Sequence, residues 1–225
     1  IQADSIAAVE AAQRMSSDTA SVAQVAAAPV SIYKDSLLEA AHSAEAQIVT
    51  LANDKFEVAF TTKGAQPYSV KINEYSSYGG GELFIFKPEM SRYDIQVYAG
   101  ETINTADFNF VVAEKTDTSL AMRLPFAGGG YIEQRYSIAE GSYSVKNYLL
   151  FVGMENVIPK NVFSFDVDYF VTMPRMEKGY KSEVQYSKLD YYFNGEKKPE
   201  AIAKGRSAQK RVDARVSWFA FQQQF

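Results

Sequence analysis

The chain has 225 residues, no cysteine, and 23 Lys and Arg against 27 Asp and Glu, which gives a formal net charge of −4. Without cysteine, a disulfide framework and Cys-ligated zinc are excluded. The mild acidity is spread along the chain and argues against a nucleic-acid partner, which needs clustered basic residues. There is no run of about 20 apolar residues, so no segment is expected to span a bilayer.

Residues 1–47 differ from the rest, and residues 5–29 are rich in Ala, Ser, Gln and Val without an aromatic residue. A segment with so few large apolar side chains cannot offset the entropy of ordering. Residues 34–47 contain better helix formers, and Asp35 or Ser36 is a candidate N-cap. We therefore interpret residues 1–47 as a tether that is largely disordered or marginally helical.

From Ile48 onward the apolar residues recur with a period of two, which is typical of β-strands. Phe56, Val58 and Phe60, for example, share one strand face. Further strand candidates, separated by Gly-bearing turns, cover residues 68–72, 83–86, 93–98, 108–114, 120–126, 131–138, 143–152, 162–171 and 183–193. This pattern predicts a mainly β fold, an antiparallel β-sandwich, as one domain over residues 48–205. Residues 148–152 have no polar break, which predicts a central strand covered on both faces.

The last segment, residues 206–225, is expected to be helical because its period changes and it becomes aromatic. It ends without a cap, a Gly or a charged last turn, so we expect a more hydrophobic continuation such as a membrane span. A helix with apolar sides and preceding basic residues suits a membrane interface, although docking wholly on the sandwich is an equal alternative. The candidate membrane-interface or partner-contact residues are Arg211, Arg215, Trp218, Phe219, Phe221 and Phe225.

Candidates for catalysis are few. The only histidine, His42, lies in the predicted tether, so Ser-His-Asp and Cys-His arrangements are close to excluded. Asp166 and Asp168 project from one strand face, with Val167 on the opposite, core side; a solvated face is a simpler interpretation than a catalytic or calcium-binding pair. Glu133 and Arg135 are expected to form an exposed ion pair of small value. We predict no enzyme activity, no cofactor, no metal and no small-molecule substrate.

A competing class is a glycan-binding β-sandwich, for which Tyr191-Tyr192-Phe193 is the candidate aromatic platform. Neighbouring strand residues point to opposite faces, so only part of this triplet can line one surface. Because Tyr is also a normal strand former, core packing is the stronger interpretation.

Residues 216–225 (VSWFAFQQQF) closely resemble the segment that joins the periplasmic domain of the bacterial YidC membrane-protein insertases to their membrane core. Residues 49–58, followed by Lys63-Gly64-Ala65, resemble the opening strands of that family. Tyr136-Ser137-Ile138 and Tyr143-Ser144-Val145 resemble its central hairpin. The resemblance covers roughly residues 48–225. The segment AFQQQF at residues 220–225 and the Tyr-rich strands indicate a Bacteroidetes-type member.

The resemblance implies a β-supersandwich like that of the galactose mutarotases, on the periplasmic side of the bacterial inner membrane and cut before the second transmembrane helix. It implies a domain that supports membrane-protein insertion and folding by positioning an interfacial helix and offering a partner-binding surface. The implied partners are nascent membrane proteins, the Sec translocon and the membrane surface. Sugar isomerisation is not carried over, because mutarotase-like sites use His and the predicted β domain has none.

Overall fold

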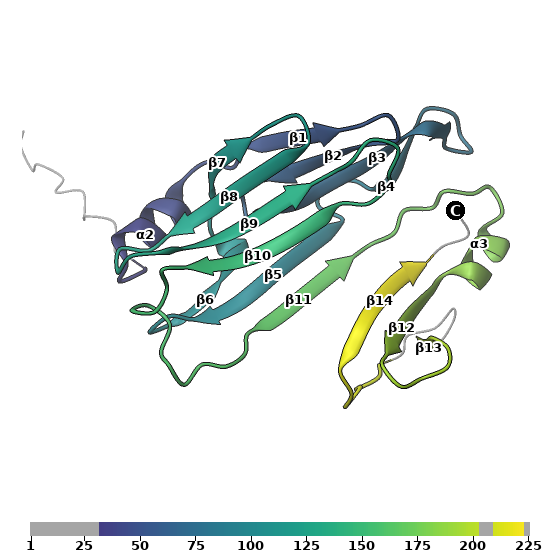
Figure 1. The fold of residues 1–225 in the computed structure, drawn as a ribbon. Helices are drawn as coiled ribbons and strands as arrows, with labels where there is room; N and C mark the ends of the chain where they lie inside the picture. Colours follow the sequence, from purple (N-terminus) through teal and green to yellow (C-terminus); the bar gives the residue numbers. More distant parts are fainter. Residues whose placement is uncertain (1–31, 203–208, 223–225) are drawn as a thin grey trace, which may run out of the picture. The chain divides into compact units, whose positions relative to one another are not determined.

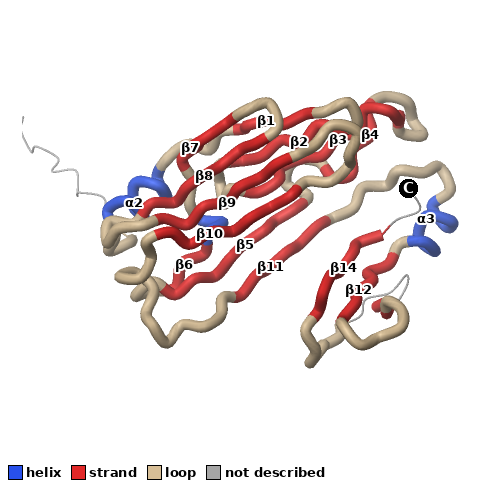
Figure 2. The backbone as a smooth tube through the Cα atoms, in the orientation of Figure 1, coloured by secondary structure: helices blue, strands red, loops and turns tan. Residues whose placement is uncertain are grey.

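Strands are the main regular secondary structure of the chain that this computed structural model describes, residues 32–202 and 209–222, and the helices are short (Figure 2). The chain divides into two units, Ile1–Ile32 and Tyr33–Phe225, and every element below lies in the second. The expected mainly β, antiparallel fold is confirmed, and its sheets are consistent with a β-sandwich. Of the tether predicted for residues 1–47, residues 1–31 lie outside the described residues.

Two four-stranded antiparallel sheets build the first part of this unit (Figure 1). One has the order β1-β2-β3-β4, from strands Ile48–Ala52, Phe56–Thr61, Gln66–Ser76 and Glu82–Phe86. The other has the order β10-β9-β8-β7, in which β7 is Val111–Lys115, β8 is Ser119–Pro125, β9 is Tyr131–Ser137 and β10 is Lys146–Val152.

Two three-stranded antiparallel sheets complete the described fold. In the sheet β11-β5-β6 the strands are Asp166–Val171, Ser91–Tyr98 and Thr102–Asn104, and in the sheet β13-β12-β14 they are Glu200–Ile202, Lys188–Phe193 and Val216–Gln222. The helical pieces are α2 (Ser36–Ser43), the 3-10 turn η1 (Thr105–Asp107) and α3 (Tyr180–Tyr186).

The core lies between sheets. Phe56, Val58 and Phe60 of β2 are almost completely buried, as their shared face predicts. The ring of Phe60 meets that of Tyr136 from β9 at 4.4 Å between centroids, and the Tyr136 hydroxyl donates to the carbonyl of Ala65 at 2.8 Å. This pair joins the sheet β1-β2-β3-β4 to the sheet β10-β9-β8-β7, and the hydrogen bond satisfies the buried hydroxyl.

Helix α2 forms where the sequence predicts a short helix, and it packs into the same core. Asp35 is its N-cap, accepting from the backbone N–H groups of Leu37 and Leu38, and Leu38 is buried. The second carboxylate oxygen of Asp35 accepts from the N–H of Ala127 at 2.8 Å. The interpretation of residues 34–47 as part of a tether is therefore corrected, since apolar burial and this cap hold the helix on the β unit.

The interpretation of His42 as a linker residue is corrected as well. Its ring lies 5.3 Å from that of Tyr33 and 6.2 Å from that of Phe108, between ring centroids. It is a half-buried residue of the last turn of α2 and not a linker residue.

Strand β10 is an edge strand, so the prediction of a central strand covered on both faces is wrong. Within the described residues β10 pairs only with β9, and the side chains of Tyr148, Leu150 and Val152 are exposed. A continuous apolar run shows only the local composition of a strand. Whether the strand is covered on both faces depends on which strands pair and pack beside it.

The predicted C-terminal helix is also corrected. Residues 216–222 form strand β14, the yellow strand of Figure 1, which pairs antiparallel with β12 from Lys188↔Gln222 to Phe193↔Val216. Val and aromatic residues suit a half-buried pleated surface, and ladder hydrogen bonds to β12 override the helical spacing. Of the predicted helical segment, residues 206–208 and 223–225 lie outside the described residues.

Candidate partner-contact surface

The aromatic residues predicted for contact lie on both faces of β14. Trp218 pairs with Tyr192 of β12, and their rings stack at 5.8 Å between centroids. Phe219 and Phe221 surround Tyr169 of β11, at 6.2 and 5.8 Å between ring centroids. Because side chains alternate along a strand, Trp218 and the two phenylalanines cannot line one surface. Trp218 stays 42% exposed and Phe219 52% exposed.

The predicted basic residues are solvated. The Nε of Arg211 lies 3.0 Å from Oδ1 of Asp213, and both side chains are more than four-fifths exposed. Arg215 is exposed immediately before β14. Phe225 lies outside the described residues. Of the six predicted residues, the structure therefore brings together only Phe219 and Phe221, through their contacts with Tyr169 and with each other.

The candidate glycan platform is divided between core and surface. Tyr191 is buried, and its hydroxyl donates to Oε2 of Glu200 at 2.5 Å. The hydrogen bond from Lys210 Nζ to the same oxygen, also 2.5 Å, raises the pKa of Lys210 and keeps it charged. Of the triplet, Tyr192 alone stacks on the exposed Trp218.

A groove that the sequence did not reveal opens beside β11. We call it the tyrosine groove, with a volume of about 520 Å³, and its lining includes Tyr93, Tyr136, Val145, Val167, Tyr169 and Phe219. Burial raises the pKa of Tyr93, partly offset by the amide of Gln134, and burial also raises the pKa of Tyr169. These phenols therefore stay neutral at physiological pH, and the groove presents apolar rings without charge.

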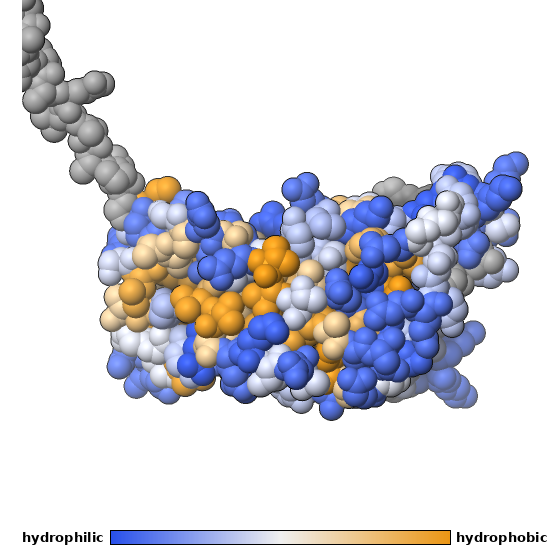
Figure 3. Space-filling model, turned by 90° about the horizontal axis from the view of Figure 1, so that it is seen from above, coloured by the Kyte–Doolittle hydropathy of each residue, from blue (hydrophilic) through white to orange (hydrophobic). Residues whose placement is uncertain are grey.

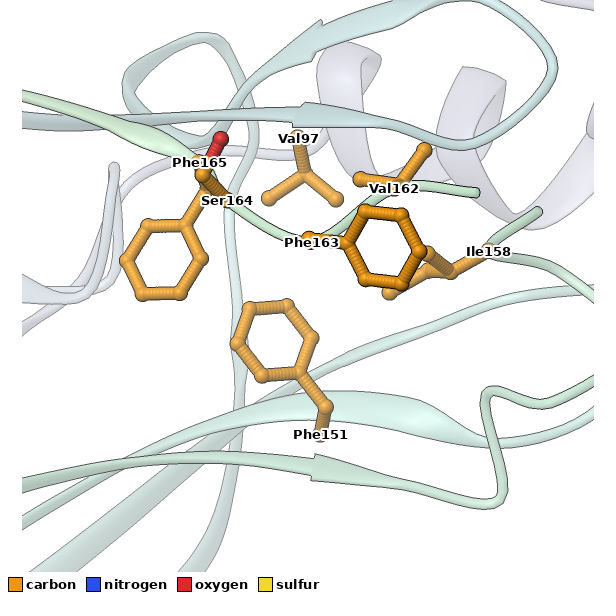
Figure 4. Close-up of a pocket in the computed structure, with 7 residues that line it drawn as sticks. All are labelled: Val97, Phe151, Ile158, Val162, Phe163, Ser164 and Phe165. Carbon is orange, nitrogen blue, oxygen red and sulfur yellow. The ribbon is translucent and has the colours of Figure 1, made fainter. Parts of the chain in front are cut away.

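A second hollow of about 230 Å³ lies at the start of β11, and we call it the phenylalanine hollow. Figure 4 shows the rings of Phe151, Phe163 and Phe165 around it, and Val97 and Ile158 also line it. The rings of Phe151 and Phe165 lie 5.6 Å apart between centroids, and Phe163 is 91% exposed. A phenylalanine this exposed covers no core, so it is available for contact with another molecule.

Along residues 165–169 an apolar face lies opposite an acidic one, and the exposed Phe170 follows on the acidic side. Phe165 lines the phenylalanine hollow, and Val167 and Tyr169 line the tyrosine groove. The alternation predicted this face, but its side chains remain partly exposed because β11 is an edge strand. Asp166 and Asp168 point the other way, are exposed, and form no ion pair with another described residue. Their expected solvated face agrees with this arrangement.

Glu133 is the place where the ion-pair prediction needs correction. Its side chain is 2% exposed, and it accepts from Nε of Arg123 at 2.6 Å and from Nε of Arg135 at 2.9 Å. Burial alone would raise the pKa of Glu133, but these two hydrogen bonds outweigh it and hold the pKa below its usual value. We call this network the Glu133 clamp: a buried carboxylate on β9 held by two partly exposed arginines, Arg123 of β8 and Arg135 of β9.

Exposed apolar surface is not confined to the terminal sheet. The side seen in Figure 3 carries apolar residues, in orange, gathered between polar ones. Edge strands β1 and β7 contribute exposed Ile48 and Val111.

Among residues 32–202 and 209–222, no cluster of three or more His, Cys, Asp or Glu side chains is placed to hold a metal ion. In the same described ranges, no helix is long and apolar enough to cross a membrane.

Comparison with known proteins relates the chain to membrane protein insertases. It is 27% identical over 223 residues to the membrane protein insertase YidC of Phocaeicola vulgatus, covering 99% of this chain and 36% of that protein. Against YidC of Porphyromonas gingivalis it is 25% identical over 238 residues, covering 100% and 38%. Against YidC of Bacteroides fragilis it is 25% identical over 191 residues, covering 84% and 31%.

The chain thus spans about a third of the length of these curated relatives. No family model and no solved structure matches it. The resemblance to Bacteroidetes YidC insertases that the sequence motifs indicated is confirmed.

Proposed function

We propose that this chain is the periplasmic domain of a bacterial inner-membrane protein insertase and that it supports the insertion and folding of membrane proteins without catalysing a reaction. The supporting observation is a similarity to such insertases that extends over nearly the whole chain. The proposal involves no cofactor, no metal, no small-molecule substrate and no nucleic acid.

In this proposal the terminal sheet β13-β12-β14 is the contact element. Trp218 and Phe219 offer large half-exposed rings, and the exposed Arg215 precedes their strand in the sequence. Aromatic rings favour the headgroup level of a membrane, where the ring is partly buried and cations meet phosphate. A paired strand can hold these side chains as firmly as the helix that the sequence suggested, because β12 fixes its register.

The partners in this proposal are nascent membrane proteins, the Sec translocon and the membrane surface, each reached as part of the complete insertase. Half-exposed aromatic residues supply much contact area at small entropic cost, and they are enriched in protein interfaces. Trp218 faces one side of the terminal sheet and Phe219 the other, so two contacts can be made at once.

The test replaces Trp218 and Phe221 with Ser, singly and together, in the complete insertase. We expect slower insertion of a model membrane protein in proteoliposomes and weaker association of the domain with vesicles. Tyr98→Ser is the matched control, since Tyr98 is a similarly exposed aromatic residue at the end of β5. Unchanged insertion and docking in the double variant would contradict the proposal, provided that circular dichroism shows the variant folded.

The competing function, a glycan-binding module, is favoured by one feature, the exposed stack of Trp218 on Tyr192. Sugar rings pack on such aromatic faces. A glycan array probed with the purified chain separates the two functions, because an insertase domain gives no selective glycan signal.

A further inference from the structure

Strand β11 has an open edge next to two apolar hollows. Within the described residues it pairs only with β5, and neighbouring β14 pairs only with β12. Val167 and Tyr169 on β11 and Phe219 on β14 line the same tyrosine groove. An edge strand carries backbone N–H and C=O groups that can pair with another extended chain.

The opposite face of β11 carries charge without a partner. Asp166 and Asp168 are exposed and form no ion pair with any other residue in the described ranges. The register neighbour of Asp168 on β5 is Asp94, which is buried, contacts Arg92, and accepts from the backbone N–H of Ala106. Asp94 is therefore already satisfied, and its neighbourhood adds no free cation to balance Asp166 and Asp168.

We propose that the open edge of β11 binds an extended peptide segment as an added strand, with apolar side chains in the tyrosine groove and Lys or Arg side chains beside Asp166 and Asp168. Addition of a strand to a sheet edge takes affinity from main-chain hydrogen bonds and specificity from alternate side chains. The inference rests on the proposed function, because it names the kind of partner segment that such a domain would hold.

The alternation of β11 selects a peptide over other apolar ligands. An added strand places successive side chains on opposite faces, so one set meets Val167 and Tyr169 while the other meets Asp166 and Asp168. An acyl chain would fill the groove but leave the strand edge and both carboxylates without partners. A neutral glycan would leave the charge of both aspartates unbalanced. The preferred segment therefore alternates apolar and basic residues.

The test measures binding of fluorescent peptides to the purified chain by anisotropy. The probe has about nine residues, enough for one strand of usual length, and alternates Leu with Lys. One comparison peptide has the same composition with its Leu and Lys residues in separate blocks, and a second alternates Leu with Glu. We expect the alternating Leu-Lys peptide to bind most tightly and to protect the backbone amides of β11 from hydrogen exchange.

Variants of the chain locate the contact. The double variant Asp166→Asn, Asp168→Asn should weaken binding of the Leu-Lys peptide by about 2- to 30-fold, the effect of losing two cross-strand charge pairs. Val167→Ser should weaken all three peptides because it reduces the apolar lining. Asp117→Asn is the matched control, since Asp117 is exposed in the turn between β7 and β8.

Three outcomes would overturn the inference: equal binding of the alternating and block peptides, no effect of the double asparagine variant, or an equal effect of Asp117→Asn. Selective binding of lipid vesicles or glycans at the groove, without peptide binding, would overturn it as well. The assay contains no membrane and no insertase core. Loss of this inference therefore leaves the insertion result for Trp218 and Phe221 standing, and failure of that insertion test does not alter peptide affinity.

Discussion

The aromatic residues of the sandwich core and those of the terminal sheet behave differently although their types are the same. Phe60 is fully buried against Tyr136, because one sheet covers it from each side. Phe219 contacts Tyr169 and Phe221 but remains half-exposed, because β14 is an edge strand of a three-stranded sheet. Aromatic residues therefore form buried core in the sandwich and exposed contact surface in the terminal sheet.

This difference separates the residues that stabilise the fold from the residues that are free to contact a partner. Side chains covered on all sides contribute most to the free energy of unfolding, whereas edge elements with few buried groups open more easily and are free to bind. The buried cluster draws on α2 and on strands β1, β2, β5, β6, β8 and β9, and the described residues of β12 and β14 add none of its members. The terminal sheet can change without unfolding the core.

The largest expected effect sharpens that contrast directly. Phe60→Ala should lower the free energy of unfolding by about 3–5 kcal/mol, because it removes a fully buried ring and leaves a cavity. Phe219→Ala should cost about 1 kcal/mol or less, as expected for a half-exposed side chain. Urea unfolding followed by circular dichroism measures both, and similar losses would contradict the division into core and contact surface.

The next effect concerns the Glu133 clamp. Glu133→Gln should lower the free energy of unfolding by about 1–3 kcal/mol at neutral pH, since charge-assisted hydrogen bonds from Arg123 and Arg135 are weakened. The pKa of Glu133 is lowered in the fold, so its contribution is present above the unfolded value of about 4.3 and disappears as the pH falls through the folded value.

The comparison is therefore made at two pH values. The difference in unfolding free energy between the native chain and the Glu133→Gln variant should shrink in acid, because protonated Glu133 no longer benefits from the arginines. Other carboxylates titrate alike in both proteins and cancel. A difference that stays constant from neutral pH into acid would show that the clamp is not what stabilises this part of the core.

A smaller effect tests whether α2 belongs to the core. Asp35→Ala should cost about 1 kcal/mol, because it removes the N-cap of α2 and the acceptor for Ala127 N–H. Asp35→Asn keeps one capping oxygen and should cost less. Equal unfolding free energies for the native chain and Asp35→Ala would mean that α2 does not stabilise the core and belongs to a tether.

The smallest effect is expected at the terminal segment. Arg211→Ala should leave the unfolding free energy unchanged within error, because the Arg211–Asp213 pair is almost fully solvated. A measurable loss in thermal or urea unfolding would mean that the fold holds this segment as it holds the core. Asp213→Ala is the reciprocal control.

Several features could be predicted from local sequence. The buried face of Phe56, Val58 and Phe60 follows from the period of two, and Asp35 as a cap follows from its place before a helix-forming run. The tyrosine groove could not be predicted in this way. Its lining comes from six strands and one loop, and no local pattern states that Tyr93, Tyr169 and Phe219 will meet.

Sequence by itself determined the strand-rich character, the likeness to Bacteroidetes insertases and the acidic and apolar alternation along residues 165–169, because these depend on residue types and their spacing. Only the tertiary structure decided that residues 148–152 form an edge, that residues 216–222 form a strand, and that Glu133 is buried between two arginines. The physical reason is common to all three. Coverage, ladder pairing and desolvation are set by neighbours distant in the chain, and a local pattern carries no record of them.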